Sequence, residues 1–185
     1  MGRVLGVDGC PGGWVVARVD EAGVAWSFFA HARDLLAVDA DVIGIDIPVG
    51  FPEHGVRGCE AAARTRLGVA RSSVFLVPPR PVVETVGYPQ ANTRAKELTG
   101  KGLMSRQPEA LFVRMRQVDE VADDPRWVEV HPEVSFRAVE SGLADALDAL
   151  AVAWSARRWL RGTAEVLPGE PPPYDRRGRP MRIVV

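Results

Sequence analysis

Short apolar segments alternate with glycine-containing turns in the N-terminal part of the chain. The segments are 3–8 (RVLGVD), 14–19 (WVVARV) and 24–30 (VAWSFFA), and GCPGG and DEAG separate them. Runs rich in β-branched and aromatic residues between such turns are typical of β-strands. Because the connections are short, we expect an antiparallel meander of three strands.

The pattern then changes to alternating helices and strands. Residues 31–38 (HARDLLAV) predict a short helix, and 41–48 (DVIGIDIP) form a β-branched apolar run that is typical of a parallel strand covered on both faces. The further expected elements are a helix at 59–67, a second helical stretch within 90–117 after Gly100 and Gly102, a strand at 127–136 and a long helix at 143–162.

The length of 185 residues fits one domain. We expect that domain to span 1–166, with a helical insertion at about 52–117, followed by a proline- and arginine-rich tail at 167–185. The tail is expected to lie on the surface without regular structure. In the long helix, the spacing of four, three and four residues predicts one core-facing stripe, formed by Leu143, Leu147, Leu150 and Trp154.

Composition indicates an ordinary water-soluble domain. Hydrophobic residues make up 46% and charged residues 25% of the chain, and no stretch approaches the length of a membrane span. The N-terminus enters the strand pattern directly, without the apolar segment of a secretory signal, so we expect a cytoplasmic protein with no membrane partner. Cys10 and Cys59 show no metal-binding spacing and are expected to be reduced thiols.

Positive charge is concentrated in the middle of the chain. Residues 57–116 hold eleven Arg or Lys and four Glu, a surplus of seven positive charges in a chain of net charge −1. Such a block predicts an anionic partner such as nucleic acid, with Arg64, Arg71 and Arg80 holding its phosphates. The alternative is a bias toward arginine, with the charge merely dispersed over the surface.

Aspartates end two of the apolar segments. Asp8 follows the first segment and Asp46 closes VIGID, while Asp145 and Asp148 lie on one face near the start of the final helix. A right-handed crossover makes the two strands parallel, and as neighbours they direct both carboxylates into one crevice at the strand ends. Converging carboxylates repel one another unless a divalent cation holds them, and oxygen ligands suit Mg²⁺ or Mn²⁺.

Each acid also has a local explanation. Asp8 could cap the glycine-rich turn, Asp46 could form a turn at the strand end, and Asp145 could complement the helix dipole. The predicted strand 127–136 adds Glu129, His131 and Glu133 on one parity. Glu133 could join the acidic cluster, and His131 could be a ligand, a proton shuttle or an ordinary residue at a strand edge.

The order of these motifs resembles known proteins. The segments VLGVDGCPGGWVVARV and DALDALAVA are similar to the first-strand and last-helix motifs of Holliday-junction resolvases of the ribonuclease H-like superfamily. The series GVDGCPGGWVVA, IDIPVGFP, ARSSVF, EVHPEVSF and LDALAVAW is more closely similar to DUF429, a family described as predicted nucleases with a ribonuclease H-like fold. The resemblance covers most of residues 3–162.

The resemblance implies an α/β, ribonuclease H-like fold and a metal-dependent nuclease. By it, Asp8 is the central ligand of two Mg²⁺ or Mn²⁺ ions and Asp46 is the second acid. Asp145 or Asp148 is then the helix acid. As our leading hypothesis, Asp46, Glu133 and Asp148 complete the coordination of the two ions that Asp8 bridges. The chain departs from the family pattern because only residues 137–142 separate EVHPEVSF from the last helix. This short segment implies that part of the structure covering the substrate is absent.

Two other functions remain open at this point. An actin-like ATPase or phosphotransferase also begins with an aspartate and a glycine-rich phosphate loop, but its two subdomains would not fit this length. A non-catalytic ribonuclease H-like binding module would keep the fold without the chemistry. DNA, RNA, a branched junction and a nucleotide are all open as substrates, and so is the oligomeric state, with a dimer among the possibilities.

Overall fold

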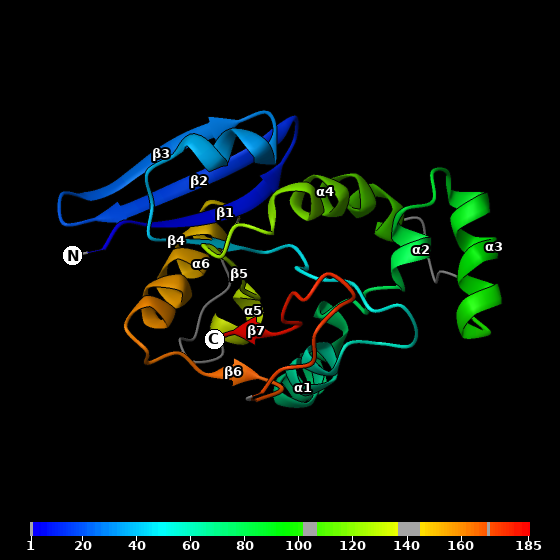
Figure 1. Ribbon diagram of the computed structural model, residues 1–185. Helices are drawn as coiled ribbons and strands as arrows, with labels where there is room; N and C mark the ends of the chain where they lie inside the picture. The colour runs from blue at the N-terminus through cyan, green and yellow to red at the C-terminus, as the bar shows by residue number, and fades with distance from the viewer. Residues whose placement is uncertain (1, 102–106, 137–144, 170) are drawn as a thin grey trace.

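The computed structural model describes residues 2–101, 107–136, 145–169 and 171–185. A five-stranded sheet with the strand order β3-β2-β1-β4-β5 forms its centre (Figure 1). β1, β2 and β3 form an antiparallel meander, and β4 and β5 are parallel to β1. The expected α/β class, with a meander followed by parallel strands, is confirmed. The strands are β1 (Val4–Cys10), β2 (Gly13–Asp20), β3 (Gly23–Phe29), β4 (Val42–Ile45) and β5 (Trp127–Glu129).

Helices fill most of the connection between β4 and β5. They are α1 (Gly58–Leu67), the 3-10 helix η2 (Gly68–Ser73), α2 (Arg80–Val83), α3 (Tyr88–Thr99) and α4 (Gln107–Val121). The 3-10 helix η1 (Ala32–Ala37) precedes β4, whereas α5 (Pro132–Phe136) and α6 (Asp145–Leu160) follow β5. Over the described ranges, no helix combines the length and apolar character needed to cross a bilayer.

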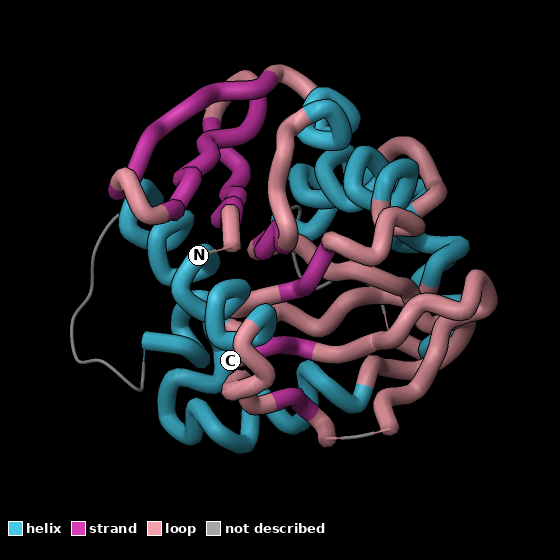
Figure 2. Tube along the Cα trace, turned by 60° about the vertical axis from the view of Figure 1, so that its left-hand side comes forward, coloured by secondary structure: helices cyan, strands magenta, loops and turns pink. Residues whose placement is uncertain are grey.

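Helices cover both faces of the sheet (Figures 1 and 2). On one face, residues of η1 and α4 such as Leu35, Phe112 and Met115 pack with Val7 and Ile45 of the strands. On the other face α6 packs against β1, β2 and β4. The alternation of side chains along β1 therefore supplies two separate cores, and the strand ends between them remain open to a ligand.

Gly44 lets α6 lie directly on β4. A Cβ atom at this position would be 2.8 Å from Cγ1 of Val152 and 2.9 Å from Cβ of Ala156. The sheet-facing surface of α6 is accordingly formed by Val152, Ala153 and Ala156. The predicted core stripe is wrong for Trp154, which is 43% exposed, because the helix presents its small residues to the sheet.

Replacing Gly44 with alanine should lower the free energy of unfolding by about 1–3 kcal/mol, because the added methyl group forces α6 away from β4. Urea unfolding followed by circular dichroism measures this loss. Ser27→Ala on the exposed strand β3 is the control, with an expected change within about 0.5 kcal/mol. An unchanged Gly44→Ala midpoint would show that α6 does not pack on β4 as described.

The predicted strand at 127–136 is too long. Pairing with β4 ends at Glu129, and helix α5 begins at Pro132. Proline cannot donate a hydrogen bond to a sheet, but its fixed φ suits the first turn of a helix. The carbonyl oxygen of His131 accepts from the N–H groups of Val134 and Ser135, which starts that turn.

The expectation of a surface tail at 167–185 is also wrong. Strand β6 (Val166–Leu167) pairs with β7 (Ile183–Val184), and Val184 forms a bridge with Val130. Ile183 and Val185 are buried in a third apolar cluster with side chains of α1 and α5. The proline-rich sequence hides this contribution, because the apolar residues that close the core come only at its very end.

Candidate active site

The alignment of β1 with β4 determines where two of the predicted acids lie. These strands are parallel neighbours, and Val7 is aligned with Ile45. Asp8 and Asp46 are the next residues, so they take adjacent positions at the carboxyl end of the pair. The N–H of Asp46 donates to the carbonyl oxygen of Val7 at 3.3 Å, which holds the two segments together there.

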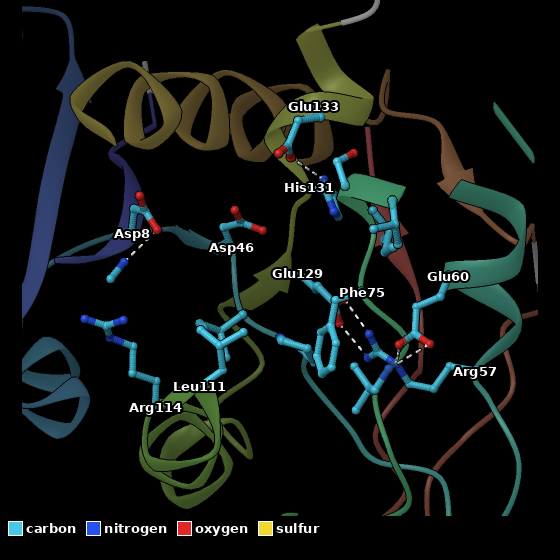
Figure 3. A pocket seen from close by; sticks show the side chains of 17 residues that line it. Asp8, Asp46, Arg57, Glu60, Phe75, Leu111, Arg114, Glu129, His131 and Glu133 are labelled. Carbon is cyan, nitrogen blue, oxygen red and sulfur yellow. Dashed lines mark hydrogen bonds and ion pairs between the residues drawn. The ribbon is translucent and has the colours of Figure 1, made fainter. Parts of the chain in front are cut away.

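Both acids line a pocket of about 220 Å³ at this edge of the sheet. Figure 3 shows Asp8 beside Asp46, with His131 and Glu133 on the far side of Asp46 and with Arg114 of α4 facing Asp8. The prediction that parallel neighbouring strands bring these two aspartates into one crevice is confirmed. The elements around the pocket are far apart in sequence, so the fold alone assembles it.

Asp8 has one short local hydrogen bond. Its Oδ1 accepts from the N–H of Gly9 at 2.6 Å, which agrees with a contribution to the following turn. Asp8 does not end β1, because the strand continues to Cys10 in its pairing with β2. Only the pairing with β4 ends before Asp8, and this leaves the side chain at the border between sheet and pocket.

The environment of Asp46 favours its neutral form. Burial raises the pKa of Asp46 to about 8, and the charges of Asp8 and Glu133 act in the same direction, whereas His131 opposes them. A buried carboxyl group with other carboxylates nearby behaves in this way, even with one histidine beside it. A cation bound next to Asp46 would favour its ionised form.

His131 and Glu133 form a pair beside Asp46. Nδ1 of His131 lies 2.8 Å from Oε2 of Glu133. Burial opposes the charged imidazole, but the carboxylates of Glu133 and Asp46 outweigh burial and raise the pKa of His131. The same contact with His131 lowers the pKa of Glu133. The pair thus favours a protonated His131 and an ionised Glu133, next to Asp46.

A buried ion-pair network fixes the loop that follows Asp46. Arg57 donates to both carboxylate oxygens of Glu129, at 2.7 and 2.6 Å, and its Nε donates to Glu60 at 2.6 Å. Glu129 also accepts from the N–H of Val49 at 2.7 Å, and Arg57 donates to the carbonyl oxygens of Val49 and Gly50. Glu129 thus has a supporting role beneath the pocket.

Of the two acids predicted on the final helix, the structure describes the side chain of Asp148 but not that of Asp145. Asp148 is partly buried but does not line the pocket. Because Gly44 lies against Val152 and Gly2 against Leu160, α6 runs antiparallel to β1 and β4. Asp148, one turn before Val152, is consequently at the level of the strand ends.

The three predicted phosphate-binding arginines have different surroundings. Arg71 is exposed on η2, and Arg64 is partly exposed and donates to the carbonyl oxygen of Val74 at 3.0 Å. Arg80 is fully buried and pairs with Asp119 at 2.7 Å and Asp175 at 3.0 Å. The prediction for Arg80 is wrong, because a guanidinium enclosed by carboxylates cannot reach a phosphate backbone.

Within the described ranges, no three His, Cys, Asp or Glu side chains are already arranged as the ligands of one metal ion. The pocket instead contains two aspartates, and a histidine and a glutamate also line it.

A family model matches residues 6–144 and 141–173, which is most of the chain. The chain belongs to the DUF429 family. The family is described as proteins of unknown function. No curated protein matches the chain, and no solved structure matches it.

Some pocket residues of this DUF429 protein carry no signal in the sequence. Arg57 and Arg114 are two of eleven basic residues in the central block, and nothing in their spacing distinguishes one from the other. Both line the pocket, but Arg57 is paired with the buried carboxylates of two glutamates, and among the ion pairs between described residues none includes Arg114. Phe75 and Leu111 also line it, on the side opposite the aspartates. The tertiary surroundings, and not the sequence spacing, separate the roles of the two arginines.

In metal-free buffer, the DUF429 protein should lose stability as the pH rises from about 4 to 8. Asp46 has a folded-state pKa of about 8 against an ordinary value of 3.8, so the folded chain binds the proton more tightly. That stabilisation is complete below the unfolded value and disappears as the pH passes the folded one, at a cost of about 1–3 kcal/mol for a partly exposed group. Urea unfolding at several pH values in EDTA measures it.

Asp46→Asn is the control for this dependence, because the variant has no group to titrate at position 46. Its stability should change less with pH than that of the parent protein. Equal slopes for the two proteins would show that Asp46 has an ordinary pKa.

Proposed function

We propose that this DUF429 protein is a divalent-cation-dependent nuclease that hydrolyses phosphodiester bonds. The observation that carries the proposal is the adjacent placement of Asp8 and Asp46 in one pocket, at the end of two parallel strands. Ligands of α/β sheets bind at such strand ends. Paired carboxylates that hold divalent cations are a common device for phosphodiester hydrolysis.

The topology supports a ribonuclease H-like assignment. Three antiparallel strands come first, the fourth and fifth lie parallel to the first, and a late helix crosses the sheet. This order agrees with the resemblance of the first-strand and last-helix segments. One fold can serve many functions, so the pocket residues, and not the topology, support the proposed chemistry.

The donor atoms of the pocket suit Mg²⁺ or Mn²⁺. Asp8 and Asp46 would hold the cation, and Glu133 at the rim offers a further carboxylate. Burial raises the pKa of Asp46, and a cation beside it would favour the ionised form that can act as a ligand. A bound cation would stabilise the negative charge that develops on the phosphoryl oxygens during hydrolysis.

Other residues of the protein can supply a proton donor and positive charge for the substrate. His131, whose pKa the carboxylates of Glu133 and Asp46 raise, can donate a proton to the departing oxygen of the substrate. Arg64 and Arg71 are available outside the pocket to attract a phosphate backbone. Asp148 lies at the level of the strand ends and remains a proposed helix acid. Asp145 remains one on sequence grounds alone.

A cleavage assay with and without cations tests the proposal. Purified protein is incubated with single-stranded, duplex and branched DNA and with RNA, in Mg²⁺, Mn²⁺ or EDTA. We expect cleavage of at least one substrate in Mg²⁺ or Mn²⁺ and none in EDTA. The double variant Asp8→Asn/Asp46→Asn, purified in parallel, controls for contaminating nucleases. Equal cleavage by the double variant, or none by the parent protein on any substrate, would contradict the proposal.

A further inference from the structure

Arg114 is held in a fixed place on the wall of the pocket. Its Nη2 donates to the carbonyl oxygen of Cys10 at 2.7 Å, and its guanidinium carbon lies 5.9 Å from the centre of the Trp14 ring. Gly9 leaves the space that the side chain occupies, because a Cβ atom there would be 2.7 Å from Nε of Arg114. The glycine after Asp8 therefore has a specific use. It lets an arginine lie against the first strand, facing the aspartate (Figure 3).

The charge of Arg114 is not neutralised by a carboxylate of the described residues. Arg57 and Arg80, which are also in the central basic block, are enclosed by ion pairs. Among the ion pairs between described residues, none includes Arg114. A guanidinium that keeps free donors and lines a cavity is well suited to bind a phosphate.

The pocket has an apolar side next to this arginine. Leu111 precedes Arg114 by one turn of α4, and Phe75, from the segment after η2, lines the pocket on the far side of Leu111 (Figure 3). With about 220 Å³, the cavity is smaller than the roughly 300–1,000 Å³ of drug-sized ligand sites. It offers room for one small unit with an anionic and an apolar end. The side of a double helix presents paired bases and would not enter.

We infer that this pocket binds one nucleotide unit of a single strand, with its phosphate on Arg114 and its sugar or base against Phe75 and Leu111. The inference rests on the proposed function, because it names the substrate that the aspartates would act on. Aromatic side chains beside a positive charge are the usual means of holding single-stranded nucleic acid without sequence preference. A free nucleotide has the same chemistry as a nucleotide at a strand end, so both are probes.

Equilibrium binding of unreacted ligands tests this inference. The probes are thymidine 3′,5′-bisphosphate, a single-stranded DNA of ten nucleotides and the same sequence as a duplex, each titrated in EDTA and in Ca²⁺. We expect Arg114→Gln to weaken binding of the first two probes at least tenfold, and Arg114→Lys to weaken it less. The single strand should bind the parent protein at least tenfold more tightly than the duplex does.

Two further variants distinguish binding in the pocket from binding that depends only on the overall charge of the protein. Gly9→Ala keeps the arginine but displaces it, so it should weaken binding without a change in net charge. Arg94→Gln removes an exposed arginine that pairs with Glu97 on α3, and it should leave binding unchanged. Thermal melts of each variant identify any loss of folding, and the conservative Arg114→Lys and Gly9→Ala variants keep the test decisive if Arg114→Gln unfolds.

The outcomes distinguish this inference from the proposed function. Unchanged binding in Arg114→Gln and Gly9→Ala, or equal affinity for duplex and single strand, would overturn the nucleotide site. Cleavage with an unchanged KM in Arg114→Gln would do the same and leave the nuclease proposal standing. Binding that depends on Arg114, without cleavage in any cation, would support the site and refute the nuclease.

Discussion

Replacing Asp8 with asparagine should reduce Mg²⁺- or Mn²⁺-dependent cleavage at least about 10³-fold, because the variant loses the charge that holds the cation next to Asp46. The fold should remain, since the oxygen of asparagine can still accept the N–H of Gly9, as Asp8 does at 2.6 Å. In metal-free buffer the variant should melt at the same temperature as the parent protein or higher. The charge of Asp8 is among those that raise the pKa of Asp46, and the substitution removes it.

Two measurements made together check this prediction, a cleavage time course and a thermal melt in EDTA. Asp20→Asn is a matched control, because Asp20 is the last residue of β2, accepts the N–H of Ala22 and lies outside the pocket. A variant at position 8 that still cleaves would remove Asp8 from the mechanism. One that melts far below the parent protein would identify Asp8 as a residue that caps the turn.

Replacing Arg57 with methionine should lower the free energy of unfolding by about 3–5 kcal/mol, which is the largest stability effect that we expect in this protein. The side chain of Arg57 is 1% exposed, and it is the partner of two buried carboxylates, Glu129 and Glu60. Methionine fills much of the space but leaves both carboxylates without their counter-charge. The loop at Val49 and Gly50 also loses a donor to each of its carbonyl oxygens.

Urea unfolding at pH 7 measures this loss, with Arg94→Met as the matched control at an exposed arginine. The control should change stability by less than about 0.5 kcal/mol. Adding Glu60→Gln and Glu129→Gln to Arg57→Met should restore part of the loss, because neutral amides cost less to bury than unpaired carboxylates. A loss below about 1 kcal/mol in Arg57→Met would show that water reaches these acids.

The sheet and its two aspartates could be predicted from the sequence because they depend on local patterns. Alternation along 3–8, 14–19 and 24–30 gives the meander. The apolar run that ends at Asp46 requires a strand covered on both faces, and chain connectivity then makes that strand parallel to the first. If these two strands are neighbours, the residues that follow their paired segments meet, and the pairing of β1 with β4 supplies this condition for Asp8 and Asp46.

The parts of the fold and of the site that the sequence does not predict depend on contacts between residues that are far apart in the chain. Pro132 begins a helix within a segment whose apolar pattern predicts a continuing strand. The apolar residues after Pro180 pack with α1 and α5, and Val184 forms a β-bridge with Val130. Arg57, Arg80 and Arg114 have the same chemistry in the sequence. Their roles differ only because carboxylates from distant elements surround the first two.

If Asp8 and Asp46 hold a divalent cation, an anomalous difference map from crystals grown with Mn²⁺ should show it. We expect a peak in the pocket within about 2.5 Å of side-chain oxygens of both aspartates. Such a peak should be absent from crystals of Asp8→Asn. A map without a peak in the pocket would show that the two aspartates do not hold the cation. So would aspartate oxygens more than about 8 Å apart, since that distance exceeds what ions about 4 Å apart can bridge.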